Sequence, residues 1–91
     1  MAKQAVKPPL TFKDLRHSTD LEFKDISNEE IREYIFPYPK GKLTIYNPIA
    51  VAITKSGSHR VLDAQGWSYR VDPSFISVSW KSREGKNHFA F

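Results

Sequence analysis

The chain has 91 residues, of which 40% are hydrophobic and 26% charged, and a formal net charge of +4 at pH 7. This length suits one domain rather than two, and the absence of cysteine excludes a disulfide framework, a thiolate nucleophile and a cysteine-based zinc site. No run approaches the eighteen or so apolar residues of a membrane helix, and the start of the chain does not resemble a signal peptide. We therefore expect a cytoplasmic protein with no membrane partner.

Positive charge is concentrated in the second part of the chain. Residues 1–36 hold six lysines and arginines against seven aspartates and glutamates, a net −1, whereas residues 37–91 hold eight against three, a net +5. A field of this sign attracts nucleic acid or an acidic partner. The cations are scattered rather than gathered in one run, which is also typical of an ordinary solvated surface.

The first elements along the chain are an arm and an early turn. Residues 1–9 contain a proline pair, two lysines and little to bury, which predicts a flexible arm. Residues 10–91 are expected to form the single small domain. Within them, Thr11 and Asp14 have the spacing of a helix cap, which indicates a short helical turn.

The segment SNEEIREYIF, residues 27–36, allows two interpretations. Ser27 and Glu30 have the spacing of a capping box, which predicts a short helix over residues 28–33. The competing interpretation starts a strand at Arg32, because apolar and polar residues alternate from there to a turn-forming PYPKG. We favour a turn of helix that runs into a strand.

From Pro37 onward, short strand-like runs alternate with turn signals. The runs are KLTIYN, IAVAIT, HRVLD, WSYRV and FISVSW, and HFAF at residues 88–91 can add a last short strand. Gly57 and Gly66 can supply the positive φ that hairpin turns need, and Asp63 can begin one of these turns. This spacing is the pattern of an antiparallel meander.

Alternation within these runs predicts which side chains face the core. The apolar positions are Leu43 and Ile45, then Val51 and Ile53, then Trp67, Tyr69 and Val71, then Ile76, Val78 and Trp80. One buried and one wet face per strand is typical of a curled antiparallel sheet. Because closure removes exposed edges, we expect a mainly β fold: a small antiparallel barrel or roll of SH3-like size, with a short N-terminal helix.

The residue types and their spacing give little support for a catalytic site or a metal site. Ser58 and His59 are neighbours in a strand, so their side chains point to opposite faces, and Asp63 is explained by its turn. His17, His59 and His88 lack the spacing of a ligand motif. We therefore expect no catalytic residue, no cofactor and no metal, and we rank an enzyme third among the function classes.

Two binding functions remain. Exposed aromatic loops are common docking surfaces for proteins, and hairpin tips often present binding residues. Cations interleaved with aromatic rings on a small barrel instead suit nucleic acid, for which Lys81 is a further candidate. The candidate binding residues are Phe36, Tyr38, Lys40, Lys42, His59, Arg60 and Arg70.

Residues 32–80 also resemble a family of small bacteriophage-encoded proteins of unassigned function. The matching elements are Phe36-Pro37, Asn47-Pro48, the run from Ser56 to Arg60, and Ile76 to Trp80, whereas Tyr38-Pro39-Lys40 is an insertion before the glycine. The resemblance implies a phage accessory protein in the host cytoplasm and no catalytic residue.

The sequence thus predicts a non-enzymatic module that binds a protein partner, with a nucleic-acid-binding small barrel as the alternative. It makes no prediction of the oligomeric state.

Overall fold

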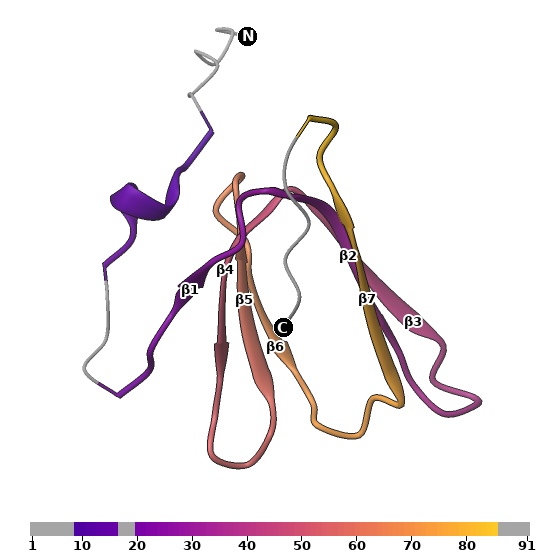
Figure 1. Cartoon of the computed structure of the whole chain (residues 1–91). Coiled ribbons are helices and arrows are strands. Elements are labelled where there is room, and N and C mark those ends of the chain that lie inside the picture. The colour runs from indigo at the N-terminus through magenta and orange to yellow at the C-terminus, as the bar shows by residue number, and fades with distance from the viewer. Residues whose placement is uncertain (1–8, 17–19, 86–91) are drawn as a thin grey trace, which may run out of the picture.

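The structure is a computed structural model that describes residues 9–16 and 20–85. Within these ranges the chain forms two antiparallel sheets and one short 3-10 helix, η1 (Phe12–Asp14) (Figure 1). In spatial order, the four-stranded sheet consists of β1 (Lys24–Asp25), β4 (Pro48–Ile53), β5 (His59–Asp63) and β6 (Ser68–Val71). The three-stranded sheet consists of β3 (Lys42–Tyr46), β2 (Glu29–Ile35) and β7 (Ser77–Ser82).

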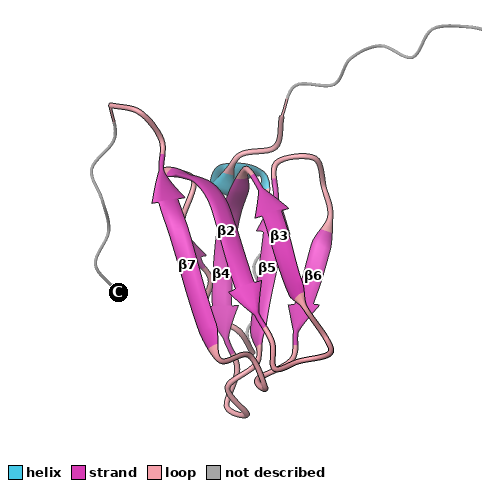
Figure 2. Cartoon of the chain, turned by 90° about the vertical axis from the view of Figure 1, so that its right-hand side faces the viewer, coloured by secondary structure: helices cyan, strands magenta, loops and turns pink. Residues whose placement is uncertain are grey.

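The mainly β prediction is confirmed, but the expected barrel is wrong. The two sheets face each other as layers (Figure 2), and no ladder joins them among the described strands. Closure would require β1 to pair with β7 and β6 with β3. β1 has two residues and β6 has four, so each is short for a bridging ladder. The sandwich is therefore open along both sides.

The core fills the space between the sheets. Its buried apolar residues are Ile26, Tyr34, Ile45, Val51, Val61 and Val71. Val51, Val61 and Tyr69 lie in register across β4, β5 and β6, so their side chains share the inner face of the four-stranded sheet. Burial of these side chains is the main favourable term in the stability of the fold.

Three residues predicted to face the core are exposed instead. Ile53 at the end of β4 is 62% exposed, while Trp67 and Ile76 are 65% and 68% exposed. Trp67 directly precedes β6, and Ile76 directly precedes β7. Neither residue belongs to a strand whose pleat would direct it inward.

The helix predicted over residues 28–33 is wrong, because β2 begins at Glu29. Ser27 does not cap a helix; its backbone N–H and its hydroxyl donate to Asp25 Oδ1. β2 is the central strand of its sheet and pairs with both β3 and β7. These two ladders outweigh a local helix signal of one turn. The competing strand interpretation was right in kind but began three residues late.

The predicted N-terminal turn is present only as η1, where the backbone N–H and hydroxyl of Thr11 donate to Asp14 Oδ2 at 2.8 and 3.0 Å. The Leu10 N–H donates to the Ala64 carbonyl at 2.8 Å, which fixes the start of the described chain to the β5–β6 turn. Most of the predicted arm, and the predicted strand at residues 88–91, lie outside the described residues.

Two hairpin turns form as predicted. Gly57 has φ +90° in the β4–β5 hairpin and Gly66 has φ +97° between β5 and β6. Asp63 begins the second turn, where its Oδ1 accepts the backbone N–H groups of Gln65 and Trp67, both at 2.9 Å. Within the described part of the chain, no helix is both long enough and apolar enough to cross a bilayer.

Candidate functional site

A buried ion pair lies on the inner face of β2. Glu29 is 0% exposed, and Arg32 Nε donates to its Oε1 at 3.1 Å while Nη2 donates to Oε2 at 3.4 Å. Residues three apart would face opposite sides of a regular strand, but the pairing of β2 with β7 shifts between Glu29 and Ile31. This bulge turns both charged side chains inward, where each compensates the other's burial.

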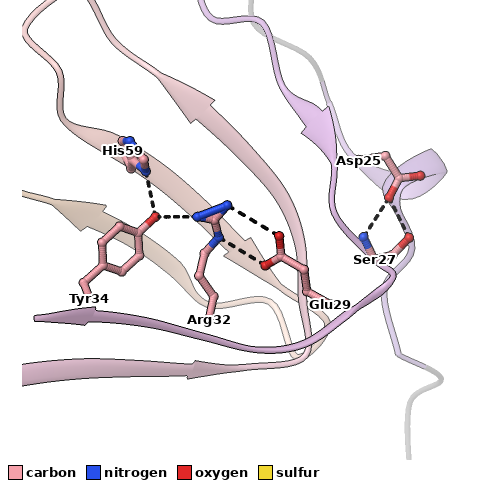
Figure 3. A network of polar contacts seen from close by, with 6 residues as sticks. All are labelled: Asp25, Ser27, Glu29, Arg32, Tyr34 and His59. Atoms are coloured by element: carbon pink, nitrogen blue, oxygen red, sulfur yellow. Dashed lines mark hydrogen bonds and ion pairs between the residues drawn. The ribbon is translucent and has the colours of Figure 1, made fainter. Parts of the chain in front are cut away.

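The ion pair continues into a chain of hydrogen bonds that connects the two sheets (Figure 3). Arg32 Nη1 donates to the Tyr34 hydroxyl at 3.4 Å, and that hydroxyl lies 2.8 Å from His59 Nδ1. Arginine only donates, so the tyrosine oxygen accepts in the first of these bonds. The direction of the second bond depends on the tautomer of His59: Nδ1 accepts from the hydroxyl when the imidazole proton lies on Nε2, and donates to it when the proton lies on Nδ1.

Burial sets the protonation states of Tyr34 and His59. Burial lowers the pKa of His59 below its ordinary value, and the positive charge of Arg32 lowers it further. Burial also raises the pKa of Tyr34 to about 12, although Arg32 opposes this change. The hydrogen bond between the sheets therefore joins two neutral groups at pH 7.

Aromatic contacts hold the same side chains in place. The Arg32 guanidinium lies 5.1 Å from the centroid of Trp80 and 5.8 Å from that of Tyr34. Phe75 packs edge to face against Tyr34 and His59, with centroid distances of 5.1 and 5.0 Å. These contacts have the geometry of favourable cation–π and aromatic pairs.

This polar chain borders a cavity of about 370 Å³ between the sheets, which we call the inter-sheet cleft. Its lining residues are Lys24, Arg32, Val51, Ile53, His59, Val78 and Trp80. β4 and β7 supply the apolar walls, Arg32 supplies N–H groups, and His59 supplies an edge of its imidazole ring. The cleft can therefore hold an apolar body and donate hydrogen bonds to an oxygen acceptor.

A second cavity, of about 350 Å³, lies between β3 and β6, and we call it the basic hollow. It is lined by Phe36, Lys40, Lys42, Leu43, Arg70, Val71, Asp72 and Ser74. This set shares no residue with the lining of the inter-sheet cleft. Because β3 and β6 lie at the opposite edges of their sheets from β7 and β1, the two cavities occupy the two open sides of the sandwich.

The acidic groups at the basic hollow already have partners. Asp72 Oδ2 accepts the backbone N–H of Ser74 at 3.0 Å. Hydrogen bonds from Ser74 lower the pKa of Asp72, and the nearby charge of Lys40 adds to this effect. Lys42 lies 3.6 Å from a carboxylate oxygen of Glu33 at the exposed rim. Among the described residues, three cations thus face two carboxylates, which leaves an excess of positive charge at the hollow.

Five of the seven predicted binding residues line one of these two cavities. Phe36, Lys40, Lys42 and Arg70 meet at the basic hollow, and Tyr38 lies in the adjoining β2–β3 loop with 96% of its surface exposed. His59 lines the inter-sheet cleft instead. Lys81 lies on β7, 3.7 Å from Glu30, and lines neither cavity.

Arg60 does not line either cavity, but it stands next to the basic hollow. It is the cross-strand partner of Arg70, on the outer face of the four-stranded sheet. Its Nε is buried and has no hydrogen-bond partner within the described residues. Like charges directly opposite each other are unfavourable. Neither arginine forms an ion pair with an acid in the part of the chain that the structure describes, so the two add to the positive field beside the hollow.

The residues weighed for catalysis hydrogen-bond to separate partners. Ser58 Oγ lies 2.6 Å from Thr54 Oγ1, while His59 bonds to Tyr34. Asp63 accepts its turn amides and the Tyr69 hydroxyl, the latter at 3.0 Å. No group of three potential metal ligands occurs in the described part of the chain. His17 and His88 lie outside it.

The interpretation of the sequence missed Glu29, Arg32, Tyr34 and Trp80 as members of a site. The i, i+3 spacing of Glu29 and Arg32 suits a helix surface, which concealed their role in a strand. Arg32 and Tyr34 are two residues apart and therefore share a face in any strand. If this segment is interpreted as a strand, Arg32 lies on the same face as the core residue Tyr34. That placement of a charged residue beside the core was the signal in the sequence that could have identified the site.

Comparison with known proteins adds no identity: no protein-family model, no curated protein and no solved structure matches the chain.

Proposed function

We propose that this protein is a non-enzymatic binding module whose ligand is single-stranded nucleic acid, held at the basic hollow. The observation that supports this best is the meeting of Lys40, Lys42 and Arg70 from a loop and two strands around one cavity. Positively charged grooves of this kind contact phosphates without reading the base sequence.

The exposed ring of Tyr38 supplies the second requirement. A side chain that is 96% exposed contributes almost nothing to the core, and its loop adjoins the basic hollow through Phe36 and Lys42. A flat ring beside cations is the arrangement on which unpaired bases stack. The phosphates then contact the cations while a base covers Tyr38.

Positive charge continues from the hollow onto the outer face of the four-stranded sheet. Arg70 lines the hollow and also a neighbouring cavity of about 330 Å³ with Ser56 and Ser58. Arg60 lies directly across the strand from Arg70. A nucleic-acid strand that leaves the hollow in this direction passes Asp72 and then meets one further cation, Arg60, and two serine hydroxyls.

The second candidate function is docking of a protein segment on the β2–β3 loop, which the exposed Tyr38 and its flanking prolines also favour.

We also propose a cytoplasmic location, which the cysteine-free sequence fits. The resemblance to bacteriophage-encoded proteins stays a prediction.

Fluorescence anisotropy with a labelled oligothymidylate tests the proposal. Three phosphate contacts give a slope of about −2 in a plot of log K against log salt, since each contact on a single strand contributes about −0.7. Lys40→Gln, Lys42→Gln and Arg70→Gln should each remove about 0.7 from this slope. Lys13→Gln and Lys81→Gln, at exposed lysines outside the hollow, are the matched controls.

Tyr38→Ala separates stacking from charge. It should weaken binding about five-fold or more and leave the salt slope unchanged, because stacking of one base is worth roughly 1–3 kcal/mol. A duplex of the same length should bind more weakly than the single strand. No binding at low salt, or equal losses in the two control variants, would overturn the proposal. Displacement by polyglutamate as effective as by unlabelled oligonucleotide would show that the hollow binds any polyanion, and would contradict the choice of nucleic acid as the ligand.

A further inference from the structure

The cavity of about 330 Å³ at the tip of the β4–β5 hairpin adjoins the basic hollow, and we call it the serine cavity. A Cβ added to Gly57 would lie 3.6 Å from Pro73 Cβ, so the hairpin tip lies close against the connection between β6 and β7. The serine cavity is lined by Ser56, Ser58, Arg70, Asp72 and Pro73. Arg70 and Asp72 also line the basic hollow, so the two cavities share these two residues.

Each of the two cavities offers positive charge to a phosphate. Lys40, Lys42 and Arg70 line the basic hollow. Arg70 also lines the serine cavity, and Arg60 stands directly across the strand from it. A strand that follows these cations places one phosphate in the hollow and the next phosphate against Arg70 and the hydroxyl of Ser56. The sugar between these two phosphates then lies at Asp72, the other shared residue.

Asp72 does not suit a site for phosphate alone. It is exposed, and it is the only carboxylate among the described residues that line the two cavities. Its oxygen Oδ2 accepts the Ser74 N–H at 3.0 Å, and hydrogen bonds from Ser74 lower its pKa below the ordinary value, so the group is an anion at neutral pH. An anion at this position repels phosphates.

A carboxylate in such a place gains from a ligand that brings a hydrogen-bond donor. An ionised carboxylate has about four acceptor sites, so Asp72 can accept from Ser74 and from a ligand together. Between successive phosphates, deoxyribose has no hydroxyl, whereas ribose has the 2′-hydroxyl, which can donate. Acidic side chains bind this hydroxyl in other nucleotide sites.

We propose that the basic hollow and the serine cavity together bind RNA in preference to DNA, because Asp72 accepts a hydrogen bond from a ribose 2′-hydroxyl. This inference rests on the proposed function, and it names the sugar that the same site selects.

Three labelled oligonucleotides of equal length test the inference by fluorescence anisotropy: oligouridylate, oligodeoxyuridylate and 2′-O-methyl oligouridylate. All three carry the same base. At about 50 mM salt, oligouridylate should bind about ten-fold more tightly than oligodeoxyuridylate, since a hydrogen bond to a charged group contributes about this much. The 2′-O-methyl strand cannot donate from its 2′ position, so it should bind as weakly as oligodeoxyuridylate.

Asp72→Asn tests the carboxylate itself. Asparagine can accept the same backbone N–H and so preserves the turn. Because the variant no longer repels phosphates, it should bind oligodeoxyuridylate about two-fold more tightly. Because a neutral acceptor forms a hydrogen bond about half as strong, the preference for oligouridylate should fall to about three-fold.

Asp25→Asn is the matched control. Asp25 is exposed, its Oδ1 accepts the backbone N–H of Ser27 at 2.9 Å in the same i, i+2 arrangement, and it lines neither cavity. This variant should leave the preference for oligouridylate unchanged.

The possible failures separate this inference from the proposed function. Equal affinity for oligouridylate and oligodeoxyuridylate would overturn the inference and leave the proposed function standing. Binding of the 2′-O-methyl strand as tight as that of oligouridylate, or an unchanged preference in Asp72→Asn, would also overturn it. If none of the three oligonucleotides binds, the proposed function itself is wrong, and the inference with it.

Discussion

The hydroxyl of Tyr34 on β2 and Nδ1 of His59 on β5 lie 2.8 Å apart, so that a side-chain hydrogen bond crosses from one sheet to the other. Both rings also pack edge to face against Phe75 from the connection between β6 and β7. This contact helps to hold together two sheets that share no described backbone ladder.

Tyr34→Phe should lower the free energy of unfolding by about 1–2 kcal/mol, because the partners of the hydroxyl lose a buried hydrogen bond. Urea denaturation followed by circular dichroism measures the change. Tyr38→Phe is the matched control, since Tyr38 is almost fully exposed, and it should stay within about 0.5 kcal/mol of the parent. Equal effects of the two variants would contradict a structural role for the Tyr34 hydroxyl.

Removing one member of the buried ion pair should cost more than removing both. Glu29→Ala removes the carboxylate that pairs with the buried Arg32 guanidinium, and should lower the free energy of unfolding by about 3–5 kcal/mol. The double variant Glu29→Leu with Arg32→Leu should recover most of this loss. Glu30→Ala, which breaks only the exposed pair with Lys81, should cost about 1 kcal/mol or less. A double variant less stable than Glu29→Ala would contradict this account.

His59 should make the stability depend on pH below neutrality. Its pKa is lowered in the folded state by burial and by Arg32, so the unfolded chain binds more protons as the pH falls below about 6.5. The stabilisation is complete above that pH and is lost as the pH falls toward the folded-state pKa. The stability difference between the parent and His59→Asn should therefore shrink from pH 7.5 to 5, as urea denaturation at each pH would measure.

His17 and His88 remain in both proteins, so their titration cancels in that comparison. A difference that is the same at both pH values would show that His59 titrates alike in the folded and unfolded chains.

Gly57→Ala should lower the free energy of unfolding by roughly 1–2 kcal/mol, because an alanine at its φ of +90° is strained. An added Cβ would lie 3.6 Å from Pro73 Cβ, which is ordinary contact, so the cost is one of backbone conformation. Lys55→Ala in the same hairpin is the control. If Gly57→Ala leaves the free energy of unfolding unchanged, the hairpin has a turn other than the one described.

The strands after residue 40 could be predicted because local information determines them. Apolar alternation and turn residues such as Gly57 and Asp63 act within a few positions, and the strands form where they indicated. Whether the two sheets close into a barrel could not be predicted in this way, because closure depends on the edges of β1 and β6, which remain unpaired with the other sheet among the described strands. Alternation identifies the inner face of a strand and carries no information on which strand stands beside it.

The candidate site was predicted in part for the same reason. Phe36, Lys40 and Lys42 are close in sequence, and Arg70 joins them only because β6 lies across from β3. His59 follows the same hairpin as Arg60, yet the pleat sends it to the other face. The buried Glu29–Arg32 pair depends on a bulge in β2. No residue pattern in this segment predicted the bulge.

The central claim is that the basic hollow and Tyr38 bind a single strand of nucleic acid. The most direct measurement is a titration of the isotopically labelled protein with oligothymidylate, followed through its amide chemical shifts. We expect the largest shifts in residues 36–43 and 70–74, and we expect these shifts to become smaller as salt is raised. Largest shifts on β7 or around the inter-sheet cleft, or no shifts at low salt, would contradict it.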